Sequence, residues 1–322
     1  MRTEAATIGS EQSSLCPPFP SLANNAAVFE IGGVSLSVVD PREDSYPISA
    51  SLGLFRSSSQ NPDISIQVEW VRDLPLDSAN PVFDSGCTWL LYEQGSGFRF
   101  DFRVPALGRE PYKRLLIDRQ FSQATLQIRA SSDPGDCRLT PLMYPLDELL
   151  IMHRLTQQKA IELHGCGIVR QDGTANLFVG HSGAGKSTTT RLWTSTQNAL
   201  VLSDDRIIVR RDESSEFGEE TGRRMRMYGT PWHGEAMYAS PQHSVLDRIF
   251  ILEHGRGNVL TRLAESEAVA ELFARSFVPF HRHEYVESAL TFLQEVVAAV
   301  PVYRYSFEPD QRAVDAILNF HD

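Results

Sequence analysis

The chain has 322 residues and a mass of 36.0 kDa, a length that allows two domains. Its 30 basic and 41 acidic residues give a formal net charge of -11, which argues against a nucleic-acid partner bound through a global positive field. The sequence shows neither a signal-peptide core nor a stretch of about 18 uncharged apolar residues. We therefore expect a cytoplasmic protein with no membrane and no nucleic-acid partner.

The first 140 residues are dominated by strand patterns. Residues 1–25 are rich in Ser, Pro, Asn and Ala and lack periodicity, which predicts a disordered tail. In residues 26–140, segments rich in β-branched and aromatic residues predict strands over 28–40, 64–71, 88–104 and 124–130. The Gly95-Ser96-Gly97 step is typical of a hairpin turn. This part is expected to be an antiparallel, β-rich domain.

Helices and strands alternate over residues 141–322. Apolar residues at helical spacing predict a helix that begins at Leu146, with Asp147 and Glu148 in its first turn. Strands are expected over 161–169, 175–180, 199–205, 207–211, 224–231, 245–254 and 301–309. Further helices are expected over 188–196, 266–277, 286–300 and 311–320. The alternation predicts an α/β domain, and the whole chain is expected to be α/β, or α+β overall.

The loop between the strand 175–180 and the helix 188–196 matches the phosphate-loop pattern G-x-x-x-x-G-K-[ST] in full. These loop residues and the next are expected to bind ATP: Gly180, His181, Ser182, Gly183, Ala184, Gly185, Lys186, Ser187 and Thr188. Glycines let successive N–H groups turn toward a phosphate, and the helix N-terminus adds partial positive charge. Lys186, one of three lysines in the chain, would neutralise the β- and γ-phosphates, and Ser187 would ligate Mg²⁺. The alternative is a glycine-rich turn that binds nothing.

An acidic pair, Asp204-Asp205, begins 18 residues after the loop lysine and ends an apolar run. Adjacent side chains of an extended segment point to opposite faces, so one carboxylate could face Mg²⁺ and the other an acceptor hydroxyl. A solvated turn is the other interpretation. His164 ends an earlier predicted strand and could orient an aspartate, or be a hydrogen-bonded core histidine.

Three weaker patterns keep two interpretations each. Glu235, in a loop rich in Gly, Pro and aromatic residues, could bind Mg²⁺ or lie in a structural turn. Several arginines after Asp205 could grip a phosphoryl group or form a solvated face: Arg206, Arg210, Arg211, Arg223, Arg224 and Arg226. The four scattered cysteines are expected to be free thiols, with Cys166 a small core residue and not a nucleophile.

Residues 145–235 resemble the HPr kinase/phosphorylase family, whose nucleotide fold is related to that of phosphoenolpyruvate carboxykinase. The matching pieces are His164-Gly165, the glycine-rich loop and Ser203-Asp204-Asp205. The resemblance implies catalytic roles for His164, Lys186 and Asp204, with Asp204 taking the proton of a protein serine as the γ-phosphoryl group leaves ATP. It also places Ser187 on Mg²⁺, for which Asp205 and Glu235 are the other ligands expected from the sequence. The chain departs from the family in its β-rich N-terminal half and in the segment around Glu235, and so looks like a divergent member of the kind found with lasso peptide and other peptide-modification systems.

The leading expectation is therefore an ATP- and Mg²⁺-dependent kinase that transfers the γ-phosphoryl group to a serine-type hydroxyl of a peptide or protein. One alternative is a kinase for a small molecule such as an amino acid. Another is a nucleotide-binding sensor or scaffold that transfers nothing. Neither the acceptor nor the formation of a homo-oligomer is decided by the sequence.

Overall fold

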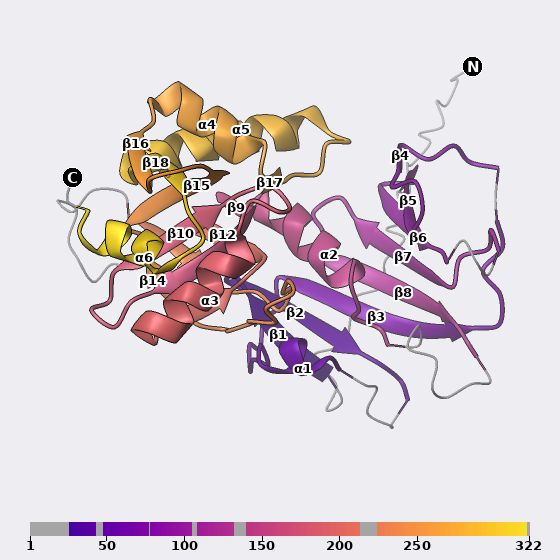
Figure 1. Cartoon of the computed structure of the whole chain (residues 1–322). Helices are drawn as coiled ribbons and strands as arrows, with labels where there is room; N and C mark the ends of the chain where they lie inside the picture. The colour runs from indigo at the N-terminus through magenta and orange to yellow at the C-terminus, as the bar shows by residue number, and fades with distance from the viewer. Residues whose placement is uncertain are drawn as a thin grey trace, which may run out of the picture.

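A computed structural model describes residues 26–42, 48–76, 78–104, 108–131, 140–212 and 224–320 of the chain. The tail expected over residues 1–25 lies outside these ranges, as does Arg223 of the arginine cluster. The described part is a mixture of helices and strands in which two large sheets dominate, an α+β arrangement (Figure 1). Within these ranges, no helix has both the length and the apolar character needed to cross a bilayer.

The N-terminal part forms an eight-stranded sheet in the order β1-β2-β3-β8-β7-β6-β5-β4. Its strands are β1 (Ala26–Ile31), β2 (Val34–Val39), β3 (Ile64–Val71), β4 (Phe83–Asp84), β5 (Trp89–Gln94), β6 (Gly97–Phe102), β7 (Lys113–Asp118) and β8 (Gln123–Arg129). The β5–β6 hairpin turns where Gly95 and Gly97 predict it.

The expectation of an antiparallel domain is wrong for two strand pairs, because β3 pairs in parallel with both β2 and β8. Parallel neighbours need long connections, which here are the segment with the short helix α1 (Ala50–Gly53) and the whole β4–β7 meander. Strand β7 was not expected from the sequence. It begins at Lys113, whose buried ammonium group donates to the carbonyls of Thr140 and Pro141.

The second sheet has ten strands in the order β14-β13-β12-β9-β10-β15-β18-β16, with β11 and β17 also paired to β9. The strands are β9 (Ala160–Val169), β10 (Ala175–Val179), β11 (Leu200–Ser203), β12 (Arg206–Arg211), β13 (Met225–Tyr228), β14 (His243–Val245), β15 (Arg248–His254), β16 (Val259–Arg262), β17 (Ser276–Phe277) and β18 (Val302–Phe307). The β10–β15 and β15–β18 pairs are parallel.

Helices cover both faces of this sheet (Figure 1). Alternate residues of a strand point to opposite faces, and β10 shows the result: Leu177 and Val179 join one core, and Phe178 the other. The first core includes residues of α4 (Glu265–Phe273) and α5 (His283–Ala299); the second includes residues of α3 (Lys186–Gln197) and α6 (Gln311–Leu318). The helix expected over 266–277 ends at Phe273, and the last two residues of that range form β17.

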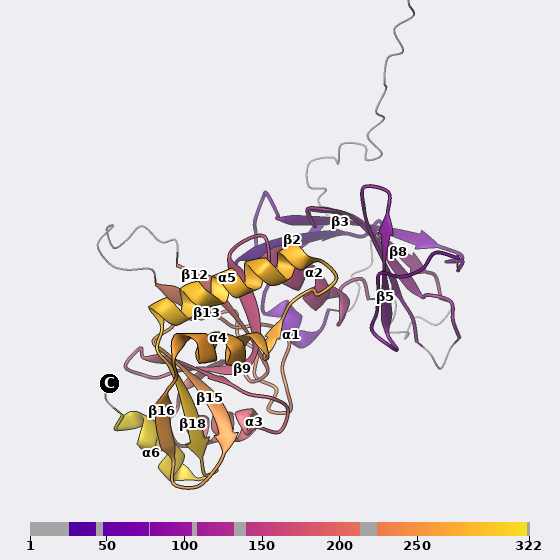
Figure 2. The same cartoon turned by 90° about the horizontal axis from the view of Figure 1, so that it is seen from above.

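The two sheets meet at α2 (Leu146–Leu155), which lies between them in both overall views (Figures 1 and 2). One hydrophobic core joins the first sheet to α2 and also takes in Ile208 and Trp232 of the second part. Arg210 of β12 donates to the carbonyl of Gly32 at 2.6 Å. Gly32 has a φ of 57°, and a Cβ there would lie 2.4 Å from Ile208, so this close approach of the β1–β2 turn requires glycine.

Candidate functional site

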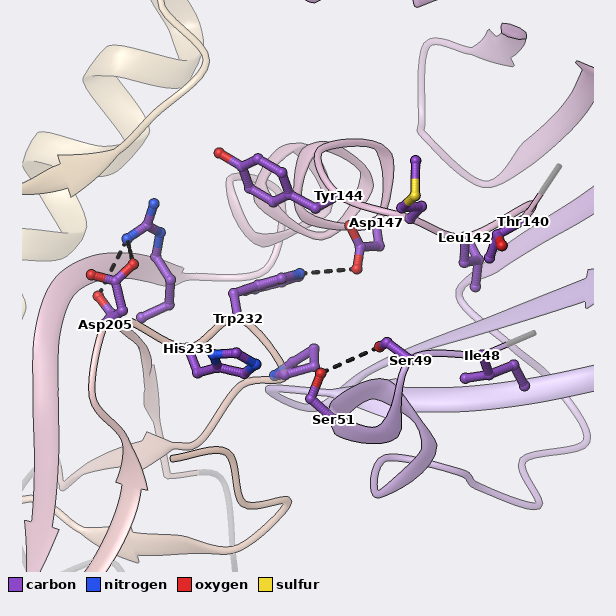
Figure 3. Close-up of a pocket in the computed structure, with 13 residues that line it drawn as sticks. Ile48, Ser49, Ser51, Thr140, Leu142, Tyr144, Asp147, Asp205, Trp232 and His233 are labelled. Atoms are coloured by element: carbon purple, nitrogen blue, oxygen red, sulfur yellow. Dashed lines mark hydrogen bonds and ion pairs between the residues drawn. The ribbon is translucent and has the colours of Figure 1, made fainter. Parts of the chain in front are cut away.

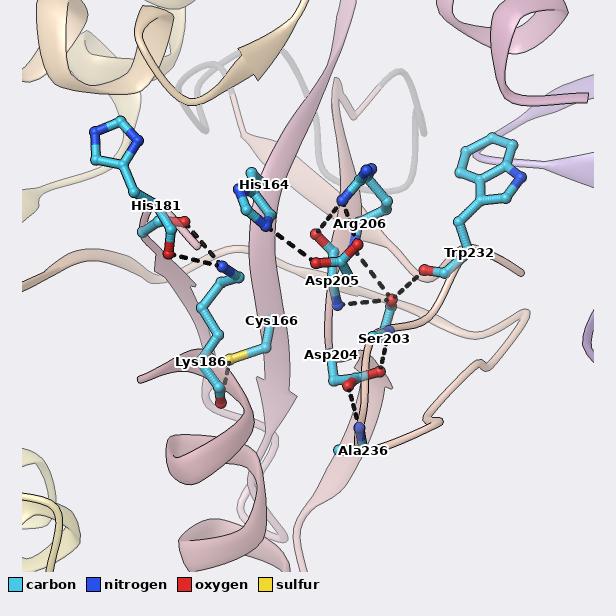
Figure 4. Close-up of polar contacts among 12 residues, drawn as sticks. His164, Cys166, His181, Lys186, Ser203, Asp204, Asp205, Arg206, Trp232 and Ala236 are labelled. Atoms are coloured by element: carbon cyan, nitrogen blue, oxygen red, sulfur yellow. Dashed lines mark hydrogen bonds and ion pairs between the residues drawn. The ribbon is translucent and has the colours of Figure 1, made fainter. Parts of the chain in front are cut away.

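The predicted site residues gather where β9 changes its neighbours on both sides. On one side β10 pairs with residues 165–169 of β9, and β17 pairs with residues 162–163. On the other side β11 pairs with the end of β9 and β12 with its beginning. We call this change of partners around residue 164 of β9 the crossing, and His164 lies at it. The glycine-rich loop leaves β10 on one side, and Asp204-Asp205 lies between β11 and β12 on the other (Figure 4). The crossing therefore unites segments that are far apart in sequence.

The glycine-rich loop turns tightly into α3. Gly183 and Gly185 have φ values of 80° and 105°, which favour glycine, and Gly185 directly precedes the helix. The Lys186 Nζ donates to the carbonyls of Gly180 and His181 at 3.0 and 3.1 Å, so the ammonium group lies across the loop. Burial lowers the pKa of Lys186, although nearby Asp205 opposes the shift. The loop thus combines a cation with a helix N-terminus, the features that bind phosphate.

A residue from another strand supports the loop. His254, the last residue of β15, lies 2.7 Å from the carbonyl oxygen of Gly183 through its Nε2. Because a carbonyl can only accept, the Nε2–H of His254 must donate. This bond ties the loop to the parallel strand that pairs with β10.

The carboxylate of Asp204 accepts hydrogen bonds from three backbone amides. It is 1% exposed and accepts from the N–H groups of Gly234, Ala236 and Tyr238 at 3.0, 2.8 and 3.1 Å. Gly234 approaches so closely that an added Cβ would lie 2.9 Å from the Asp204 carboxylate. Asp204 therefore anchors the loop 234–238 in this structure, and its carboxylate points away from Lys186 (Figure 4).

Asp205 points the other way, toward His164 and the glycine-rich loop (Figure 4). Its Oδ1 lies 3.0 Å from His164 Nε2, and its Oδ2 forms an ion pair with Arg206. Burial acts to raise the pKa of Asp205, but the hydrogen bond from His164 and the charge of Arg206 outweigh it, so the pKa is below its ordinary value. Asp205 is therefore a carboxylate near neutral pH, and the His164 Nε2–H is the donor.

The charge of Arg206 is shared among buried acids. Its Nε lies 2.8 Å from Glu148 and 3.4 Å from Glu162, and its guanidinium lies over the Phe277 ring at 4.0 Å. Burial, together with the charge of Glu148, raises the pKa of Glu162 well above its usual value, which favours its neutral form. Arg206 thus links Asp205 to the first turn of α2.

The other arginines of the cluster have separate partners within the described residues. Arg210 donates to Gly32, Arg211 pairs with Glu295, and Arg226 pairs with Asp212. Arg206 contacts the acidic pair through its ion pair with Asp205.

The predicted metal ligands are less closely joined. Ser187 is the second residue of α3, while Glu235 is exposed on the loop that holds Asp204. In the described ranges no group of three or more His, Cys, Asp or Glu side chains suits a metal ion. In kinase sites Mg²⁺ is commonly held by one or two carboxylates together with substrate phosphates. The structure therefore leaves the metal assignment a prediction.

Cysteine chemistry does not enter the site. Cys166 is fully buried on β9, and burial raises its pKa to about 12, so it is a thiol that packs in the core. Cys87 is exposed and free, and the other two cysteines lie outside the described residues.

Sequence reasoning missed Arg275 and predicted Trp232 only as part of a loop that could line a site. Arg275 follows α4, accepts the His164 N–H through its carbonyl, and has the largest effect on His181, whose pKa it lowers. Trp232 accepts from Ser203 through its carbonyl and donates its indole N–H to Asp147 at 3.0 Å. Tertiary contacts therefore place Arg275 against His164, and Trp232 against the residue that precedes the acidic pair.

A pocket of about 580 Å³ opens beside Asp205. Its walls come from both halves of the chain: residues 48–51 near α1, residues 140–147 at the start of α2, and residues 231–233 (Figure 3). Asp205 and Arg206 line the end nearest the crossing. Figure 3 shows Trp232 in the wall, with Tyr144 and Asp147 on one side of its ring and Ser51 on the other.

Comparisons of the sequence with models of protein families and with curated proteins find no match. The resemblance to HPr kinases therefore rests on the motif residues.

Proposed function

We propose that the protein is an ATP- and Mg²⁺-dependent kinase that phosphorylates a serine-type hydroxyl of a peptide or protein. The observation that carries the proposal is the convergence of the glycine-rich loop with its buried lysine and the His164–Asp205 pair at one strand crossing. A cationic loop at a helix N-terminus suits a triphosphate, and an oriented carboxylate beside it suits a hydroxyl that must lose a proton.

The roles of the two aspartates follow from where their carboxylates point. The amides of the 234–238 loop occupy Asp204, whereas Asp205 lines the pocket and touches His164. We therefore give the proton-accepting role, assigned from the sequence to Asp204, to Asp205. The acceptor oxygen would bond to the γ-phosphorus as its proton passes to Asp205 and the bond from phosphorus to the ADP oxygen breaks.

The remaining residues would hold the nucleotide. Lys186 and the loop amides would bind the β- and γ-phosphates, and the Ser187 hydroxyl would help to hold the metal. Mg²⁺, when bound, would neutralise the charge that develops between the β- and γ-phosphates. His164 would keep Asp205 ionised and oriented, and is a positioning residue by this account.

Three variants of the full chain test these roles, with γ-labelled ATP, Mg²⁺ and a mixture of serine-containing peptides as acceptors. Asp205→Asn should keep ATP affinity and lose phosphoryl transfer by a factor of roughly 10² to 10⁴, the usual contribution of a general base. Lys186→Ala should lose ATP binding itself. Asp204→Asn cannot accept from three amides with one oxygen, and should lower the melting temperature.

Each proposed role has a result that would contradict it. Wild-type turnover by Asp205→Asn would show that the proton goes elsewhere, and unchanged ATP affinity of Lys186→Ala would overturn the nucleotide site. ATP binding with no transfer to any acceptor would favour the sensor alternative.

A further inference from the structure

The pocket beside Asp205 is not explained by the nucleotide. It begins at the proton-accepting end of the site and runs away from the glycine-rich loop toward residues 48–51 of the β-rich half. We propose that it binds an apolar side chain next to the acceptor hydroxyl in a peptide substrate. This inference rests on the proposed kinase function.

Most of the surface of the pocket wall is apolar. Beyond Asp205 and Arg206, the apolar surface comes from these side chains: Ile48, Leu142, Met143, Tyr144, Pro231 and Trp232. The polar residues of this part are Ser49, Ser51, Thr140, Asp147 and His233. The volume of the pocket lies within the range of about 300 to 1,000 Å³ typical of ligand sites. It has room for more than the single methylene and hydroxyl of a serine side chain, so the rest of the space must suit a neighbouring group.

The charged residues of the wall are already paired, which argues against a free amino acid. Arg206 is the one lysine or arginine among the described lining residues, and it is held by Asp205, Glu148 and Glu162. Asp147 accepts from the Trp232 indole and from the Glu148 amide. A zwitterion would bring a carboxylate to a wall whose one guanidinium is already paired with acids, at a high desolvation cost.

The sign of the remaining charge sets the expected selectivity. Three acids, Asp205, Glu148 and Glu162, surround the single guanidinium of Arg206. A carboxylate on the substrate near the acceptor hydroxyl would therefore be repelled. A peptide bond carries no net charge, and an apolar side chain would lose only its contact with water. We therefore expect leucine or phenylalanine beside the serine to be favoured, and glutamate to be disfavoured.

Tyr144 is the residue that the proposal places against the substrate. The residue is 57% exposed although it lines the pocket near Trp232, so a bound side chain could cover it without a change in the core. Aromatic anchors of this kind contribute much of the binding energy of interfaces. Their removal at the rim should weaken binding without unfolding the protein.

The experiment uses the full chain, γ-labelled ATP and synthetic peptides in which one serine is flanked by Ala, Leu, Phe, Glu or Lys, with free serine as a further acceptor. We expect the Phe- and Leu-flanked peptides to have kcat/KM at least about tenfold above the Glu-flanked one. Tyr144→Ala should reduce the preference for Phe over Ala by about tenfold while ATP affinity stays at the wild-type level. Phe280→Ala, which removes an aromatic ring that is 60% exposed outside the pocket, is the matched control and should keep the preference.

Each other outcome decides against the assignment. Equal kcat/KM values for all flanking residues would overturn the proposed role of the pocket, as would a preference that Tyr144→Ala leaves intact. In both cases phosphoryl transfer to the peptides would still support the proposed kinase function. Transfer to free serine but to no peptide would show that the pocket serves a small molecule. Loss of ATP binding and of transfer in the wild-type protein would overturn the proposed function, and the inference with it.

Discussion

A buried histidine gives the fold a pH dependence that can be calculated. His153 of α2 is 1% exposed and stacks on Phe121 at 4.3 Å. Its Nδ1 donates to the Leu149 carbonyl, and its Nε2 has no hydrogen-bond partner among the described residues. Burial lowers its pKa from 6.5 to about 3. A proton added to this ring would therefore be buried without an acceptor.

The sign and size of the effect follow from linkage. Between pH 6.5 and about 3 the unfolded chain binds a proton that the folded chain excludes, so the stability that depends on neutral His153 is complete above pH 6.5 and is lost as the pH falls. From pH 7 to pH 5 the loss is about 2 kcal/mol, at about 1.4 kcal/mol for each pH unit below 6.5.

His153→Phe keeps an aromatic ring in the stack and removes the proton site. We expect the difference in free energy of unfolding between wild type and His153→Phe to shift by about 2 kcal/mol between pH 7 and pH 5, toward the variant at low pH, as measured by urea unfolding. The same substitution at His283, which is 82% exposed on α5, is the matched control for removing a histidine that is not buried. A wild-type-to-variant difference that is constant across this range would refute the reasoning.

Two further predictions concern the supports of the site. Gly185→Ala places a Cβ 2.4 Å from the Phe307 ring at a φ of 105°, and should lower the free energy of unfolding by about 1–3 kcal/mol. Adding Phe307→Leu to this variant should relieve the clash with the ring but not the strain of the positive φ. Full recovery of the wild-type stability in thermal unfolding would therefore contradict the argument from backbone strain. Ser203→Ala removes a buried hydroxyl that donates to the Trp232 carbonyl and accepts from the Asp205 N–H. It should lower the free energy of unfolding by about 1–3 kcal/mol, and it should lower kcat with little change in KM for ATP. An unaltered kcat would show that Ser203 does not position Asp205.

The two halves of the chain differ in how far their elements could be predicted. Most of the strands and helices of residues 141–322 are local patterns of apolar spacing, and the structure has them close to their expected bounds. In the first half, β7 was missed because Lys113 and Arg114 open a short strand with charge. The parallel pairs of β3 were also missed, because period-two patterning shows which side chains are buried but not the direction of the neighbouring strand.

The acidic pair shows the same limit within the site. Alternation predicts that Asp204 and Asp205 point to opposite faces, and they do. Which of them faces the loop depends on the register of β11 along β9, which shifts between Val201 and Ser203, just before the acidic pair. A one-residue change of register exchanges the two faces, and no local signal reports it.

The sequence by itself determined the glycine-rich loop, its position between a strand and a helix, and the order of the residues expected around a nucleotide, because these depend on backbone freedom and on neighbours a few residues away. Only the tertiary structure decided that Arg275 lies against His164, that Trp232 lies beside the acidic pair, that Asp205 and not Asp204 reaches the pocket, and that the pocket is shared with the β-rich half. The bond between Trp232 and Asp147 joins residues 85 positions apart and depends on the packing of the two sheets through α2, and the bond between His164 and Arg275 spans a still longer stretch of chain. Long-range packing of this kind leaves no periodic trace in a single sequence.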